Sequence, residues 1–248
     1  MDPADVTAVI LTRDEERNLP RALTSLPRGM PVFVLDACSR DHTLQFARGS
    51  GAEVVQRPWT NFVDARLFAL QHVRTPWVLM IDADEALDDV LCEAIVRAGS
   101  QVDAYRVKRT TYFCGKPMRL WRDEPLIRLF ALGAVTLQAQ PAARGDALLH
   151  ERWECTGRVG DLDGTLLHFS YPDLASYRAK YQRYTSVEAQ GSRPSLWRAL
   201  EAFVEGLARF VYLSVVRAAA LDGWRGIYVA FHSAMYPAVV AGKSLRHA

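Results

Sequence analysis

The chain has 248 residues, of which 50% are hydrophobic and 23% are charged, so it has ample apolar material for a folded core. Its formal net charge of +2 is too small to indicate a nucleic-acid-binding protein, and we expect no nucleic-acid partner. The 4 cysteines form no CxxC pair, which argues against a zinc site or a disulfide framework and favours reduced thiols. Because neither a signal peptide nor a run of about 18 apolar residues is present, we expect a cytoplasmic protein.

Apolar runs alternate with helical patterns in the first part of the chain. Strands are predicted at residues 6–12, 32–35, 54–55 and 77–81, and the helices between them contain residues 19–26, end near residue 47 and span about residues 61–73. This alternation predicts an α/β fold, in which a mostly parallel sheet carries helices on both faces. Ligands bind such sheets at the carboxyl ends of the strands, so a functional site is expected there.

The predicted strand at residues 77–81 ends in the acidic sequence Asp82-Ala83-Asp84-Glu85. On an extended backbone Asp82 and Asp84 would point to the same side, and their like charges would repel unless a cation lay between them. Mg²⁺ or Mn²⁺ suits such oxygen ligands and typically keeps phosphate oxygens in its shell. We therefore predict that Asp82 and Asp84 bind a metal ion. For Glu85 the favoured interpretation is the acidic first turn of a following helix.

Polar residues also follow the first two predicted strands, including Thr12, Glu15 and Asp36. They should converge with Asp82 on one crevice, and the alternative for Asp36 is that it caps the next turn. The sequence has no GxGxxG and no GxxxxGK[ST] motif, so a nucleotide would be held by acidic groups, backbone and a metal ion. Arg66, in the helix before the acidic strand, could pair with Asp82 or a diphosphate, or be solvated.

Three segments together resemble family 2 glycosyltransferases. They are TAVILTRDEE (residues 7–16), VLDACSRDHT (residues 34–43) and WVLMIDADE (residues 77–85). The resemblance runs over nearly the whole chain and implies the GT-A fold and an inverting, metal-dependent transfer. The subgroup that it resembles contains lipopolysaccharide core β-glucosyltransferases. The chain departs from the family at Asp14 (usually Asn), at Arg40 (usually Thr) and at Ala37-Cys38, which replaces a Ser-Gly-like pair.

The resemblance also implies roles for the residues at the strand ends. Thr12 and Glu15 would lie near the base and ribose of a nucleotide, and Asp36 would accept a hydrogen bond from a uracil imide. Asp84 would bind the metal ion that bridges the diphosphate, and Asp82 would contact ribose or metal. These roles would place a nucleotide-sugar donor, most simply UDP-linked, at the edge of the sheet where the strands end.

An edge strand is predicted at residues 103–111, followed by a segment that mixes aromatic and basic side chains. Such mixing suits a sugar-phosphate site, because sugars stack on rings and phosphates pair with arginine. Arg128 matches an Arg-Leu-Phe element of the family, and Trp121 is a second candidate, with core packing as its alternative. His168, on a short predicted strand at residues 166–169, could complete the metal shell, reach the diphosphate or be a hydrogen-bonded core histidine.

An inverting transfer needs a carboxylate to take the proton from the attacking acceptor hydroxyl. The His150-Glu151 pair matches a His-Glu pair that recurs in the resembled subgroup. Glu151 is therefore the candidate base, with a solvent-exposed loop glutamate as the alternative, and His150 is a candidate for the acceptor or phosphate site. The rival carboxylates are Asp123, Glu124 and Asp161.

Residues 1–192 are predicted to form the glycosyltransferase domain, with a nucleotide-binding half at 1–100 and an acceptor half at 101–192. Residues 193–248 are predicted to form two amphipathic helices that are split near Asp222-Gly223. This segment has 7 Lys or Arg and 3 Asp or Glu residues, a surplus of 7 − 3 = 4 positive charges. An apolar face edged by arginines and aromatic rings suits a membrane interface. The alternatives are a helical lid on the sheet and the seam of a homodimer.

We therefore expect a glycosyltransferase that moves a hexose, with glucose as the candidate, from a UDP-sugar to a lipid-linked glycan such as lipopolysaccharide core. It would use Mg²⁺ or Mn²⁺ and attach peripherally to the cytoplasmic side of the inner membrane. One alternative is a nucleotidyltransferase of similar fold, which would usually have a Gly-rich basic loop where this chain has Asp14-Glu15-Glu16. The other is a non-catalytic scaffold for envelope assembly.

Overall fold

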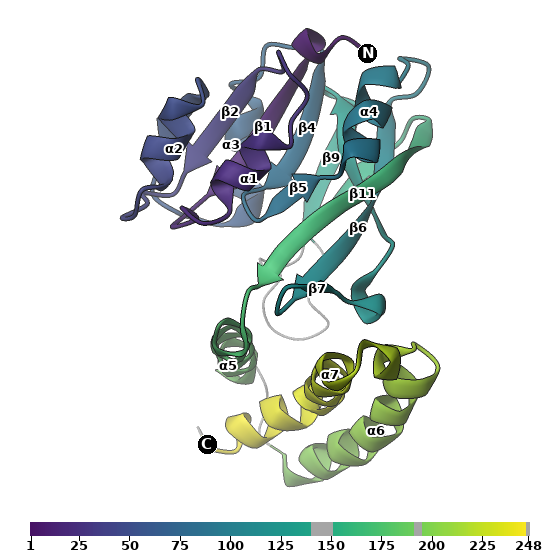
Figure 1. Cartoon of the computed structure of the whole chain (residues 1–248). Coiled ribbons are helices and arrows are strands. Elements are labelled where there is room, and N and C mark those ends of the chain that lie inside the picture. The colour runs from purple at the N-terminus through teal and green to yellow at the C-terminus, as the bar shows by residue number, and fades with distance from the viewer. Residues whose placement is uncertain (140–150, 191–194, 247–248) are drawn as a thin grey trace. The chain divides into compact units, whose positions relative to one another are not determined.

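A computed structural model of the chain describes residues 1–139, 151–190 and 195–246 (Figure 1). The contacts among them divide the chain into two compact units. The described residues of the first unit fall in 1–110, 123–139 and 151–169, and those of the second in 111–122, 170–190 and 195–246. The strand β6 (Ala104–Phe113) and the strand β11 (Val159–Tyr171) begin in the first unit and end in the second.

A mixed sheet forms the centre of the first unit. Its parallel part consists of β3 (Glu53–Gln56), β2 (Val32–Asp36), β1 (Val6–Thr12) and β4 (Trp77–Asp82), in that spatial order. The sheet continues from β4 through β8 (Glu124–Ala131), β6, β11 and β5 (Glu85–Leu87), and the pairs β4–β8, β6–β8 and β11–β5 are antiparallel. A strand is present near the predicted residues 103–111, but it is not an edge strand, because β6 lies between β8 and β11.

The two faces of this sheet have separate apolar cores. Along β1 the side chains alternate as the pleat requires: Val6, Ala8 and Ile10 enter one core, and Val9 and Leu11 enter the other. The first core also receives residues of α1 (Leu19–Thr24), α2 (Thr43–Gly49) and α4 (Asp89–Arg97). The second receives residues of α3 (Phe62–Leu70) and of the small antiparallel sheet β9 (Val135–Ala139) and β10 (Glu151–Cys155). The predicted α/β sheet with helices on both faces is confirmed (Figure 1).

Local sequence explains where the helices of the first unit begin. Pro20 is the second residue of α1, where its missing N–H is not needed. Asn61 precedes α3, and its side chain accepts a hydrogen bond of 2.8 Å from the backbone N–H of Asp64. Asp88 caps α4 in the same way, with a distance of 2.7 Å to the backbone nitrogen of Leu91. The remaining short element is the 3₁₀ turn η1 (Pro3–Asp5).

The second unit is mainly helical. It contains β7 (Lys116–Pro117), η2 (Arg119–Trp121), α5 (Leu174–Gln190), α6 (Leu196–Val215), η3 (Ala219–Asp222) and α7 (Trp224–Ser244). Phe113, Met118, Tyr177 and Val229 lie in its buried core. Gly223, with φ +63°, separates η3 from α7, so the predicted split near residues 222–223 is confirmed. Within the described residues, no helix is long and apolar enough to cross a bilayer.

Candidate functional site

The polar residues at the strand ends lie together at the carboxyl ends of the parallel strands. In the strand register Thr12 on β1 lies beside Asp36 on β2, and Leu11 lies beside Asp82 on β4. These residues lie at or near the ends of strands that run in the same direction. Parallel pairing therefore brings them close together. The expectation that the three strand ends converge is confirmed.

The loops that follow β1 and β2 bind each other through side chains. The backbone N–H of Asp14 donates to Ser39 Oγ at 2.9 Å, and the N–H of Arg40 donates to Asp14 Oδ1 at 2.8 Å. Asp14 has φ +54°, a conformation that Asn and Asp adopt more readily than most residues, which explains how Asp replaces the usual Asn there. The N–H of Glu16 donates to Asp41 Oδ2 at 3.1 Å. Burial alone would raise the pKa of Asp41, but hydrogen bonds from Thr43 and Glu16 lower it overall.

Asp36 and Glu15 already have hydrogen-bond partners within the protein. Asp36 has no exposed surface, and it accepts hydrogen bonds from the Ser39 backbone N–H at 2.9 Å and from Gln56 Nε2 at 3.2 Å. The Asp36 carboxylate thus holds the turn after β2. Glu15 accepts a hydrogen bond of 2.8 Å from Asn18 Nδ2.

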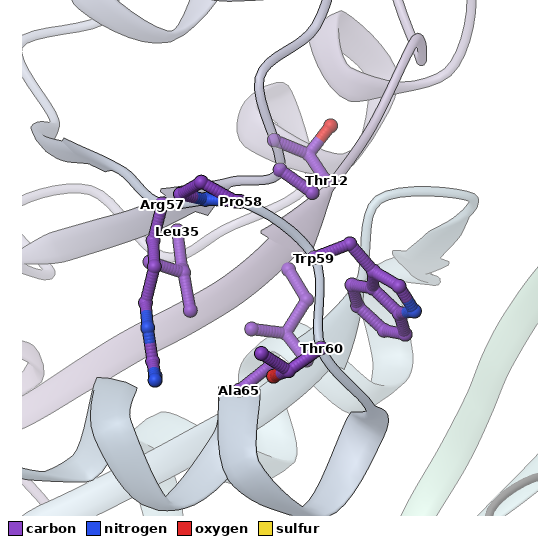
Figure 2. A pocket seen from close by; sticks show the side chains of 9 residues that line it. Thr12, Leu35, Arg57, Pro58, Trp59, Thr60 and Ala65 are labelled. Atoms are coloured by element: carbon purple, nitrogen blue, oxygen red, sulfur yellow. The ribbon is translucent and has the colours of Figure 1, made fainter.

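A small pocket lies beside Thr12, at the carboxyl ends of β1 and β2 (Figure 2). Its lining includes the apolar side chain of Leu35 and the indole of Trp59, which is 38% exposed. Thr12 is only 5% exposed, and its hydroxyl has no hydrogen-bond partner among the described residues. A buried hydroxyl without a partner is costly, so Thr12 is a candidate for a hydrogen bond to a ligand or to water.

Arg57 also lines this pocket, and its guanidinium extends away from Thr12 (Figure 2). Its Nη2 atom lies 3.0 Å from Asp64 Oδ2, and its guanidinium stacks 4.5 Å from the ring centre of Phe68. Its Nη1 atom is buried without a partner among the described residues. Neither Arg57 nor Trp59 was predicted as a site residue, because no motif marks the loop between β3 and α3.

Asp82, the last residue of β4, is paired with two arginines. Arg66 Nη2 lies 2.8 Å from Asp82 Oδ1, and Arg128 Nη2 lies 3.2 Å from Asp82 Oδ2. Burial raises the pKa of Asp82, but the positive charges of Arg66 and Arg128 outweigh it and hold the pKa well below its usual range. The predicted Arg66–Asp82 pair is confirmed, and the charge of Asp82 is compensated by the protein itself.

Glu85 has a different role from the one that the sequence suggested. It begins the strand β5 rather than a helix, and its side chain has no exposed surface. It accepts hydrogen bonds from the Asp82 backbone N–H at 2.9 Å, from Arg128 at 2.7 Å and from Arg109 at 3.4 Å. The interpretation of Glu85 as part of a helix's first turn is therefore wrong. Its buried carboxylate binds both Arg109 and Arg128.

Asp84 lies apart from these arginine pairs and is paired with His168. The expected extended backbone from Asp82 to Asp84 is wrong, because the chain turns at Ala83 and Asp84 before β5 begins. His168 on β11 lies beside Glu85 in the strand register, and its Nε2 atom is 3.3 Å from Asp84 Oδ2. Both side chains are 16% exposed, so solvent or a ligand can reach the pair.

The Asp84–His168 pair fits a divalent metal ion as a partial ligand set. It offers one carboxylate and one imidazole nitrogen, and a metal ion bound there would need its other ligands from water or phosphate oxygens. Among the described residues, no group of three or more His, Cys, Asp or Glu side chains is placed to hold a metal ion.

The other predicted site residues lie elsewhere or outside the described part. Trp121 belongs to the second unit and packs against Tyr171, with ring centres 5.5 Å apart. His150 and the side chain of Glu151 lie outside the described residues, although the backbone of Glu151 begins β10. Of the rival carboxylates, Glu124 pairs with Arg109 at 2.6 Å, and Asp161 pairs with Arg106 at 2.9 Å.

Comparison with protein families gives a match over more than half of the chain. The model described as "Glycosyl transferase family 2" matches residues 7–145. The lipopolysaccharide core biosynthesis glycosyltransferase LpsC of Rhizobium meliloti is 26% identical over 212 residues, which cover 79% of this chain and 76% of LpsC. A glycosyltransferase of Rickettsia felis is 35% identical over 200 residues, which cover 75% of this chain and 69% of that protein.

Among solved structures, the mannosyltransferase PcManGT of Pyrobaculum calidifontis, in complex with GDP-Man and Mn²⁺, has a similar fold. The superposition covers 97% of this chain and 87% of PcManGT, with a TM-score of 0.52 at 16% sequence identity. At this identity the likeness concerns the fold alone, and it confirms the predicted GT-A architecture.

Proposed function

The chain belongs to glycosyl transferase family 2, and from this premise we propose that it transfers a hexose from a UDP-sugar to a lipid-linked glycan such as lipopolysaccharide core. The observation that carries the proposal is the arrangement of side chains at the carboxyl ends of β1, β2 and β4. There a pocket lined by Trp59 and by Thr12, whose hydroxyl has no partner among the described residues, adjoins a cluster of carboxylates, arginines and a histidine. The acceptor class is proposed by analogy with LpsC, whose name refers to lipopolysaccharide core.

The pocket beside Thr12 suits the base of the donor. An aromatic side chain such as Trp59 and the apolar side chain of Leu35 can cover the faces of a planar ring. The Thr12 hydroxyl, which has no partner among the described residues, would form a hydrogen bond with the base. Asp36, at the same edge, would contribute through the turn that it holds or by accepting a hydrogen bond from the uracil imide. Glu15, in the loop after β1, would lie towards the ribose.

The diphosphate would lie at the acidic and basic cluster that follows β4. Asp84 and His168 would hold Mg²⁺ or Mn²⁺, which supplies positive charge to the leaving diphosphate when it is bound. Asp82 would contact ribose or metal, and the arginines that hold it would keep its carboxylate ionised and in place. Arg128, fixed by Glu85, would add positive charge near the phosphates.

We propose inversion at the anomeric carbon, with one carboxylate taking the proton of the acceptor hydroxyl as it attacks. Glu151 is our candidate for this base. Glu124 and Asp161 are weaker candidates, because each is held in an ion pair with an arginine. His150 and Trp121 are proposed for the acceptor side of the site. Replacement of Glu151 by Gln should abolish turnover and leave donor binding intact, and unchanged turnover would remove Glu151 from the mechanism.

The proposed acceptor would be found at a membrane. A lipid-linked glycan is embedded in a bilayer, so we propose peripheral attachment to the cytoplasmic side of the inner membrane through the C-terminal helices. The proposed activity is tested by incubating the protein and Mn²⁺ with a panel of UDP-, GDP- and ADP-hexoses and measuring release of nucleoside diphosphate. Release from UDP-hexoses, above that from the other nucleotides, is expected. No release from any donor would favour the non-catalytic scaffold.

A further inference from the structure

The helix α6 presents three different faces along its length. At about 100° per residue, positions three and four apart share one face. One face packs against α7: a Cβ atom on Gly206 would lie 2.8 Å from the carbonyl oxygen of Ala234, and Phe210 contacts Phe231 with ring centres 6.0 Å apart. Close packing against α7 thus accounts for this face.

A second face of α6 is apolar and open. Its six most regularly spaced residues are between 49% and 75% exposed: Leu196, Leu200, Val204, Leu207, Val211 and Val215. Their spacing of three or four residues places them within about a third of the circumference. Exposed apolar residues scattered singly are ordinary, but a continuous stripe along a 20-residue helix indicates an apolar partner.

The charged residues of α6 favour a lipid surface as that partner. Glu201, Glu205 and Arg209 lie on the third face, so no charge interrupts the apolar stripe. Trp197, which is 68% exposed, lies at its margin, where an aromatic ring with a polar atom suits the headgroup level. The segment 193–248 carries 7 basic and 3 acidic residues, which is complementary to anionic headgroups.

We propose that the open face of α6 inserts into the interface of an anionic bilayer, with the helix parallel to the membrane plane. The stripe lies beside a polar face that carries Glu201, Glu205 and Arg209, which is the pattern of a helix that lies in an interface rather than across it. The inference deepens the proposed function, on which it rests for the presence of an acceptor in a bilayer. It assigns the attachment to α6, because the apolar stripe of α6 is exposed among the described residues and α6 packs on α7 through a different face.

The test measures binding of the full chain to vesicles of phosphatidylethanolamine and phosphatidylglycerol by sedimentation. Val211→Glu should weaken binding at least about tenfold, because it places a charge in the stripe. Val90→Glu is the matched control, since Val90 on α4 is 54% exposed and Val211 is 60% exposed. Its binding should equal that of the unmodified chain, and circular dichroism should show the same helix content in both variants.

Equal binding by all three proteins would overturn the proposal, as would absence of binding by the unmodified chain. A stable dimer that Val211→Glu dissociates, measured by sedimentation equilibrium without lipid, would also overturn it, because a second copy would then cover the stripe. Failure here is distinguishable from failure of the proposed function. Release of nucleoside diphosphate from UDP-hexoses needs no bilayer, so it tests the donor site separately.

Discussion

The Nη2 atom of Arg128 lies 2.7 Å from the Oε1 atom of Glu85, and these side chains are only 6% and 0% exposed. Two opposite charges enclosed together depend on each other, because removal of one leaves the other buried and uncompensated. Replacement of Glu85 by Gln should therefore lower the free energy of unfolding by about 3–5 kcal/mol, measured by urea denaturation.

The control for this variant is Glu124→Gln. Glu124 also pairs with an arginine, Arg109, but its side chain is 50% exposed, so its loss should change the free energy of unfolding by less than about 1 kcal/mol. Equal effects of the two substitutions would show that burial of the Glu85 pair does not govern its contribution. If Glu85 positions Asp82 and Arg128, the folded fraction of Glu85→Gln should also bind UDP more weakly than the unmodified chain.

Thr12 and Thr7 lie on the same strand and allow a second test. The hydroxyl of Thr12 has no partner among the described residues, whereas that of Thr7 lies 2.7 Å from the Thr75 hydroxyl. Thr12→Val should keep or raise the free energy of unfolding, yet weaken UDP binding by roughly tenfold, about the value of one hydrogen bond. Thr7→Val should lower the free energy of unfolding by about 1 kcal/mol and leave UDP affinity unchanged. Unaltered UDP binding by Thr12→Val would exclude this hydroxyl from the base pocket.

The Asp84–His168 pair predicts how metal and nucleotide binding are linked. Asp84→Asn and His168→Ala should each reduce affinity for Mn²⁺ in the presence of UDP by at least about tenfold, because each removes one of two protein ligands. Binding of Mn²⁺ can be followed by electron paramagnetic resonance of the free ion. His72→Ala is a suitable control, since His72 lies beyond α3 and its ring stacks on Phe33. Wild-type Mn²⁺ binding by both site variants would refute the assignment.

Asp41 predicts a pH dependence of stability. Its pKa is lowered in the folded state, so the ionised group stabilises the fold above its unfolded pKa of about 3.9, and this contribution is lost as pH falls through the folded pKa. The difference in free energy of unfolding between the unmodified chain and Asp41→Asn should therefore be largest above about pH 5 and shrink towards pH 3. A difference that is constant over this range would mean that ionisation of Asp41 does not hold the two loops.

Much of the parallel half of the fold follows from local pattern. The apolar runs that become β1, β2 and β4 are separated by segments with helical spacing, and parallel pairing then brings their ends together without further information. Pairing of Arg66 with Asp82 was one of three alternatives that the sequence left open, and the structure shows this pair. Such inferences succeed where the partners are close in sequence or where the topology is strongly constrained.

The parts that could not be predicted depend on distant partners or on short elements. Glu85 meets Arg109 and Arg128, which are 24 and 43 residues away, and a strand as short as β5 has no periodicity to distinguish it from a helix start. The turn at Ala83 and Asp84 is likewise a consequence of β5 joining β11 rather than of local sequence. The pocket residues Arg57 and Trp59 follow the carboxyl end of β3, and this position beside the other strand ends was the signal that could have identified them.

The central claim is that one edge of the sheet binds a UDP-sugar together with a divalent metal ion. Isothermal titration calorimetry of UDP into the protein, with Mn²⁺ and with a chelator, tests this claim most directly. We predict a heat of binding with Mn²⁺ that is strongly reduced by the chelator and by Asp84→Asn. The same affinity under all three conditions, or no binding of UDP at all, would contradict it.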